Sequence, residues 1–280
     1  MFKSMTMCMA VGTLALLSNI PARADLLFTT GAPDGRMGLA SRPGAGANIE
    51  IEAADDFITG ATSTTITGAT FTGLVPLGTA LNSINFVGVE LYRVFPKDSI
   101  NPPGGFVPTR VNSPSDNAFA SRDSTAGLTF SVSILNPSFT ANNSILNGIN
   151  KVPNQTTGGE GPVTGEEVLF TITFSTPFVL APDHYFFKPE AGLSVPGTFY
   201  WLSTARPGPV FAGDLQAWIR NANLNPDWLR AGTDIVGPTS GQTFNAAFSL
   251  TGTSVPEPST TALIIAGLGL VALKRRRSAI

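Results

Sequence analysis

The sequence offers little material for acid–base or nucleophilic catalysis. His184 is the only histidine, and it stands at the start of the apolar run Tyr-Phe-Phe. A serine-type triad needs such a base beside a nucleophile and an acid, and no Gly-x-Ser-x-Gly motif accompanies it. The only cysteine, Cys8, lies close to the N-terminus, in a segment that we expect to be removed. We therefore favour a structural role for His184 and predict no catalytic residues.

Carboxylates are the next candidate catalytic groups, because glycoside hydrolysis uses two of them roughly 5 to 10 Å apart. Glu166 and Glu167 are adjacent, so in a strand they would point to opposite faces. Glu50 and Glu52 would share a face, but this spacing is more typical of a solvated strand face. Neither pair identifies a hydrolase.

Hard oxygen ligands for Ca²⁺ could come from Asp55 and Asp56, which precede Phe57, with Asp34 and Gly35 earlier in the chain. No Asp-x-Asp-x-Asp loop accompanies them. Zinc is disfavoured, since a second histidine and a cysteine in the mature chain are both lacking. Calcium at Asp55 and Asp56 is thus the one metal hypothesis, and no other cofactor is expected.

Aromatic side chains are the better clue to a ligand, because sugar rings stack on them. The tryptophans stand in the C-terminal third, among arginines and asparagines that suit hydroxyl-rich ligands. A core position is the alternative for Trp201 and Trp218, whereas Trp228, in Asn-Pro-Asp-Trp, is expected to be exposed. The candidate glycan-binding residues are Trp201, Trp218, Trp228 and Arg230.

Short runs with period-two alternation are expected to carry these residues. Residues 128–134 and 244–250 each present one apolar and one polar face, and 84–95 is apolar on both, as in an interior strand. Residues 96–127 and 136–165 are rich in Pro, Gly and Asn and are predicted to be long loops. Further strands are expected at 49–58, 64–74, 168–174, 185–188, 198–202, 215–220 and 243–251.

This pattern predicts an all-β fold, a single β-sandwich of jelly-roll or immunoglobulin-like type over residues 25–254. Composition agrees, since Gly (29) and Pro (22) are abundant and only 13% of residues are charged. Residues 25–254 hold 11 basic and 18 acidic side chains, a formal net charge of −7. A nucleic-acid partner is therefore disfavoured.

The N-terminus is typical of a secretory signal peptide. Lys3 is followed by an apolar run over residues 10–17 and then by Ala22-Arg23-Ala24, an Ala-x-Ala cleavage site. The predicted signal peptide is residues 1–24, and the mature chain would start at Asp25. The chain is therefore expected to be exported.

The C-terminus combines three short features. Val-Pro-Glu-Pro-Ser at 255–259 precedes an apolar stretch at 260–273, which is followed by a basic cluster at 274–277. As a helix, the apolar stretch would be about 21 Å long, and snorkelling basic side chains could make up the remainder of a membrane core. The positive-inside rule would leave residues 25–254 outside. We expect a transmembrane helix that anchors an external domain.

This ending resembles the PEP-CTERM sorting signal, and the resemblance is confined to residues 255–280. It implies recognition of Pro256, Glu257 and Pro258 by exosortase, a membrane peptidase thought to remove the tail in Gram-negative bacteria that make exopolysaccharide. The basic residues that would stop the helix at the membrane are Lys274, Arg275, Arg276 and Arg277.

The leading hypothesis is a non-enzymatic protein of the cell surface or extracellular matrix, anchored or released after sorting, with exopolysaccharide or another glycan as its ligand. One alternative is a secreted glycan-active hydrolase, which would place facing carboxylates beside Trp201 or Trp228. The other is a purely structural or adhesive coat protein, which would have a convex body and all three tryptophans buried.

Overall fold

The computed structural model describes residues 24–46, 48–101, 106–149, 152, 155–206, 213–237 and 243–254. Residues 1–23 and 255–280, which hold most of the predicted signal peptide and the sorting signal, lie outside them. The described elements are β1(Asp25–Thr29), β2(Pro33–Ala40), β3(Ile51–Ile58), β4(Thr64–Val75), η1(Leu81–Ser83), β5(Ile84–Arg93), β6(Ala120–Asp123), β7(Leu128–Ala141), β8(Asn143–Ile145), β9(Val163–Leu180), β10(His184–Leu193), β11(Tyr200–Thr204), β12(Trp218–Asn221), β13(Leu229–Arg230), η2(Ala231–Val236), β14(Asn245–Ala246) and β15(Phe248–Ser254). The predicted all-β class is confirmed, and within these ranges no helix is long and apolar enough to cross a membrane.

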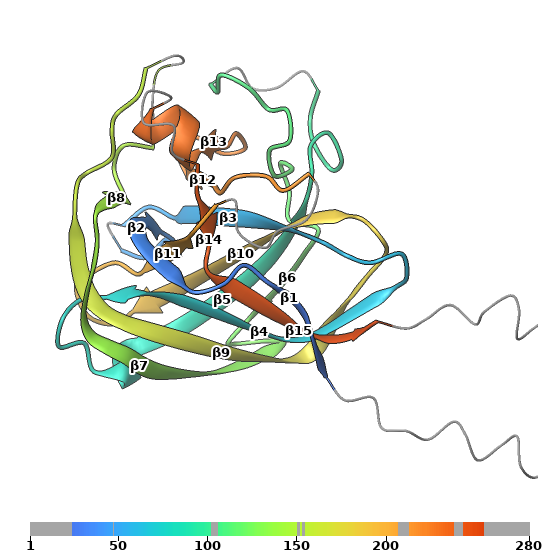
Figure 1. The fold of residues 1–280 in the computed structure, drawn as a ribbon, viewed down its shortest axis with the longest axis horizontal. Coiled ribbons are helices and arrows are strands. Elements are labelled where there is room, and N and C mark those ends of the chain that lie inside the picture. Colours follow the sequence, from blue (N-terminus) through green and yellow to red (C-terminus); the bar gives the residue numbers. More distant parts are fainter. Residues whose placement is uncertain are drawn as a thin grey trace, which may run out of the picture.

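Two sheets contain these strands (Figure 1). In the described part of the chain, the six-stranded sheet has the order β13-β12-β3-β10-β5-β6. The nine-stranded sheet follows β1-β15-β4-β11-β2-β8, with β9 on the free side of β4, β7 beyond β9, and β14 on β11. The two-sheet arrangement agrees with the expected sandwich, while the choice between jelly-roll and immunoglobulin-like topology stays a prediction.

Strand alternation places the main apolar core between the sheets. Val87, Val89 and Leu91 of β5 face this core, and Tyr92 lies in a second apolar cluster on the other face. β5 runs between β10 and β6, so its prediction as an interior strand is confirmed. We call the face of the six-stranded sheet that carries Tyr92 its outer face.

Aromatic contacts join the two sheets across the core. Phe187 of β10 stacks on Phe248 of β15 with ring centroids 4.9 Å apart, and its edge meets Trp201 of β11 at 6.1 Å. Close approach also limits side-chain size, because a Cβ at Gly73 of β4 would lie 2.1 Å from the ring of Phe199. A residue larger than glycine would therefore push this ring away from the sheet.

The predicted loops are partly strand. β6 lies within the expected loop 96–127, and β7 and β9 extend into the expected loop 136–165 from both ends. Asn136, Pro137 and Ser138 are turn-forming residues by type, yet here they only shift the register of the β7–β9 ladder, which resumes at Phe139. The extended ladder overrides the local turn signal.

Candidate functional site

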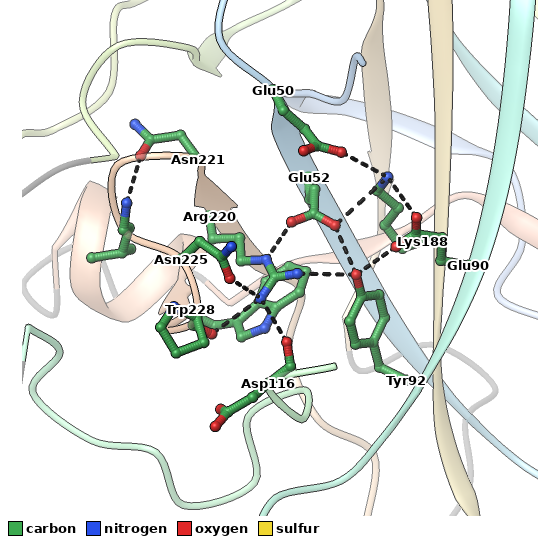
Figure 2. A network of polar contacts seen from close by, with 12 residues as sticks. Glu50, Glu52, Glu90, Tyr92, Asp116, Lys188, Arg220, Asn221, Asn225 and Trp228 are labelled. Carbon is green, nitrogen blue, oxygen red and sulfur yellow. Dashed lines mark hydrogen bonds and ion pairs between the residues drawn. The ribbon is translucent and has the colours of Figure 1, made fainter. Parts of the chain in front are cut away.

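Charged side chains from four neighbouring strands meet on the outer face of the six-stranded sheet (Figure 2). The register explains how residues far apart in sequence come together. Lys188 of β10 lies opposite Glu90 of β5, and Arg220 of β12 lies opposite Glu52 of β3. We call this set, together with Glu50, Tyr92 and Glu190, the charged network.

Lys188 is at the centre of the charged network and is fully buried. Its Nζ lies 2.9 Å from Glu190 Oε2 and 3.6 Å from Glu52 Oε1, while oxygens of Glu50 and Glu90 are each 3.9 Å away. Burial alone would lower the pKa of Lys188, but the carboxylates around it outweigh burial and hold this pKa above its usual range. The ammonium therefore stays charged inside the protein.

Arg220 is the second cation of the network. Its Nε pairs with Glu52 Oε2, and its Nη2 donates to the Tyr92 hydroxyl at 3.0 Å. Nη1 donates to the carbonyl oxygens of Pro226 at 3.1 Å and Asp116 at 3.3 Å. The guanidinium also lies over the Trp228 ring, 4.3 Å from its centroid. Arg220 thus connects the sheet to the segments that lie above it.

The Tyr92 hydroxyl lies within hydrogen-bond distance of two carboxylates but has only one proton to donate. It lies 2.8 Å from Glu52 Oε1 and 2.5 Å from Glu90 Oε2, so it can donate to only one of them at a time. Burial, and then the charge of Glu52, raise the pKa of Tyr92 far above its usual range. The phenol stays protonated and acts as a donor.

The charged network carries more negative than positive charge. Among the described residues, the cations paired with Glu50, Glu52, Glu90 and Glu190 are Lys188 and Arg220, a formal balance of −4 and +2. Burial raises the pKa of Glu50 and of Glu190, and the neighbouring Glu52 raises that of Glu50 further. The network opens to solvent at Glu50, whose side chain is 44% exposed. It can therefore take up a proton as the pH falls.

Residues 106–119, which we call the cover segment, close part of the outer face. Arg110 within it pairs with Asp116 and, at 3.0 Å, with Asp227. Asp227 also accepts the Phe106 backbone N–H at 3.3 Å, and Trp228 Nε1 donates to the Ser115 carbonyl oxygen at 3.2 Å. These contacts hold the cover segment over Trp228.

The candidate glycan-binding residues do not form an open platform. Trp201 lies in the core between the sheets, where its Nε1 donates to Ala247 O at 3.0 Å. Trp218 and Trp228 share the cluster with Tyr92 on the outer face, and Arg230 pairs with Asp234 at 2.7 Å. The prediction that Trp228 is exposed is wrong, because the cover segment and Arg220 bury it completely.

The two aspartates of the calcium hypothesis point to opposite sides of β3. Asp55 faces inward and accepts the Ala246 N–H at 2.8 Å. Asp56 lies on the side of Leu215, whose N–H it accepts at 3.0 Å, and it pairs with His184 Nε2 at 2.6 Å. Within the described residues, no group of at least three His, Cys, Asp or Glu side chains has metal-binding geometry. Calcium at this pair stays a prediction.

A groove of about 370 Å³ lies beside the outer face, at the Phe86 end of β5. Phe86, Asn48, Asn85 and Arg42 contribute to its wall, and Arg42 is held by a 2.6 Å hydrogen bond to Thr198. Sequence reasoning missed this groove because its residues come from separate segments, and none of these segments has a recognisable motif.

The fold and the charged network define an all-β, two-sheet domain with ion pairs buried on one outer face. Residues 254–278 match the family model of the PEP-CTERM protein-sorting motif. The chain thus carries a PEP-CTERM sorting signal, and the resemblance noted in the sequence is confirmed. The motif implies export, a membrane-anchored C-terminus and processing by exosortase, a membrane enzyme. No curated protein and no solved structure matches the chain significantly.

Proposed function

We propose that the chain is a non-catalytic surface protein whose external domain, residues 25–254, is a structural or adhesive unit of the cell coat. The sorting signal supplies the surface address. The structural role is supported by the charged network, in which each buried carboxylate forms an ion pair with a cation of the same domain.

The carboxylates of the charged network form ion pairs that hold neighbouring strands together, and this arrangement does not suit glycoside hydrolysis. A glycosidase needs one carboxyl group as acid and a second as base or nucleophile, with the sugar between them. Glu52 is in contact with Lys188, Arg220 and Tyr92, and its side chain is only 8% exposed. A substrate could reach Glu52 only after these ion pairs broke, so the geometry supports a structural role.

The tryptophans support the same proposal. Trp201 and Trp228 are fully buried and Trp218 is 2% exposed, so other residues of the domain cover their rings. Stacking of a sugar on any of them would require the core or the cover segment to open. This arrangement favours the coat protein over a lectin that uses tryptophan.

The test uses the exported chain, purified in mild detergent, against a broad glycan panel with and without Ca²⁺. Tm shifts report binding, and a reducing-sugar assay reports hydrolysis. The coat proposal expects neither signal, while Glu52→Gln lowers the Tm because Arg220 loses its charged partner. Sugar release that Glu52→Gln abolishes without a change in Tm would overturn the proposal.

A second candidate function is glycan binding in the groove at Phe86. The groove combines a partly exposed aromatic ring with the side-chain amides of Asn48 and Asn85, and this combination suits hydroxyl-rich ligands. If it binds glycans, Asn85→Ala should weaken binding about five-fold, which corresponds to one lost hydrogen bond of ~1 kcal/mol. Asn223→Ala, an exposed asparagine of the β12–β13 connection, is the control. Equal affinities in both variants would reject this site.

A further inference from the structure

Strand β7 has one paired edge and one open edge. Its residues from Leu128 to Ala141 pair with β9 along one side. On the other side, the structure gives no strand and no backbone hydrogen bond for residues 128–135 within its described ranges. Contacts on this side resume at the end of the strand, where Gly35 of β2 lies beside Phe139 and Thr140 and the Asn142 N–H donates to Gly35 O at 2.9 Å. Figure 1 shows β7 at the rim of the nine-stranded sheet.

The open edge lacks the features that usually protect such strands. Charged side chains, prolines, bulges and short length all discourage pairing with another chain. Residues 128–134 contain no charge and no proline, and their ladder with β9 is unbroken. The strands at the other sheet ends are short: β1 has 5 residues, β8 has 3, β6 has 4 and β13 has 2. β7 has 14 residues and differs from them in its first half, because Pro137 and both register shifts of the strand lie after Ile134.

The side chains along this edge suit another strand of the same kind. Thr129, Ser131 and Ser133 are exposed on one face, and the apolar Ile134 and Leu135 are 46% and 52% exposed. Hydroxyl pairs already join neighbouring strands of this sheet, since Thr70 Oγ1 lies 2.6 Å from Ser249 Oγ. Added pairing would extend this pattern and cover the exposed apolar side chains.

We propose that the open edge of β7, residues 128–135, pairs antiparallel with the same edge of a second copy of this chain. An antiparallel pair of identical strands has a two-fold axis, so one surface serves both partners. The edge is neutral, so copies do not repel one another there. The shared membrane address would also gather copies on one surface. The inference deepens the coat proposal, because the dimer is its assembly unit.

The test compares two lysine pairs on adjacent strands. Ser131 lies opposite Thr171 in the β7–β9 ladder, and Thr129 lies opposite Thr173, so Thr171 and Thr173 share the outward direction but belong to a fully paired strand. Sedimentation velocity of the exported chain in mild detergent should show twice the monomer mass. Ser131→Lys with Ser133→Lys should restore the monomer, whereas Thr171→Lys with Thr173→Lys should leave the dimer. Circular dichroism checks that both variants fold.

Hydrogen exchange supplies an independent readout. In the wild-type chain, alternate amides of residues 128–135 should become more protected as protein concentration rises. A monomer at all concentrations, a dimer that persists with lysines at 131 and 133, or a dimer lost from both folded variants would overturn the proposal. Glycan hydrolysis would overturn only the coat proposal and leave this dimer intact, so the two failures are distinguishable.

Discussion

The ammonium of Lys188 lies 2.9 Å from the carboxylate of Glu190, two residues further along the same strand. Alternation points both side chains to the outer face, where Glu50, Glu52 and Glu90 also surround the ammonium. A buried charge is tolerated when its partners are in place, and removal of one member leaves the others uncompensated. The buried carboxylates of the charged network therefore depend on Lys188.

Lys188→Met should destabilise the domain by roughly 3–5 kcal/mol, because Glu52 and Glu190 would remain buried without their ammonium. Urea unfolding measures the difference. The matched control is Lys97→Met, which removes an exposed lysine from a surface pair with Asp183 and should change stability by less than about 1 kcal/mol. Equal effects of the two substitutions would contradict the structural role of the charged network.

Asp55 should make the domain less stable as the pH rises. Burial, and then the charge of Asp56, raise the pKa of Asp55 well above its ordinary value in the folded state. The folded chain then binds this proton more tightly than the unfolded chain does. The contribution of Asp55 to the free energy of unfolding is complete below the ordinary aspartate pKa. It is lost as the pH rises through the raised pKa, and the free energy of unfolding then falls by up to about 1.4 kcal/mol per pH unit.

Asp55→Asn should make this pH dependence shallower, because the amide resembles the protonated acid and can still accept the Ala246 N–H. Urea unfolding over a series of pH values tests it. Asp123→Asn is the contrasting variant, since hydrogen bonds from Thr125 lower the pKa of Asp123 and give its contribution the opposite sign. An unchanged slope in Asp55→Asn would show that Asp55 is ionised in the folded chain.

Tryptophan fluorescence should report three shielded rings. Because Trp201, Trp218 and Trp228 are buried, iodide should quench the native emission only weakly, and denaturation should make quenching strong. Trp228→Phe should leave the native quenching unchanged. Strong quenching of the folded chain that disappears in Trp228→Phe would place Trp228 at the surface and restore the lectin hypothesis.

The cover segment should loosen when Asp227 loses its charge. Asp227→Asn removes the ionic partner of Arg110, although the Arg110–Asp116 pair remains. We expect faster hydrogen exchange at the amides of residues 106–116, with β9 amides unchanged. Asp98→Asn, in an exposed pair with Arg93, is the control and should leave exchange in the cover segment as it was. Uniform acceleration in all strands would instead indicate global destabilisation.

Local patterns in the sequence determined the class of the fold and the address of the chain. Apolar and polar residues alternate in β15 and β7 because each strand has one face toward the core, and the interior position of β5 follows from its two apolar faces. Pro256, Glu257 and Pro258 lie within residues 254–278, which match the sorting motif, and because this motif is continuous in sequence it can be identified without the fold.

Only the tertiary structure decided which side chains meet. Glu52, Lys188 and Arg220 come from three strands, and their contacts depend on a strand order and register that are set by non-local hydrogen bonds. Trp228 follows a turn motif typical of exposed loops, yet residues more than 100 positions earlier bury it. The open edge of β7 has the same origin, because a sequence pattern can identify a strand but carries no information about which of its edges remains without a neighbour.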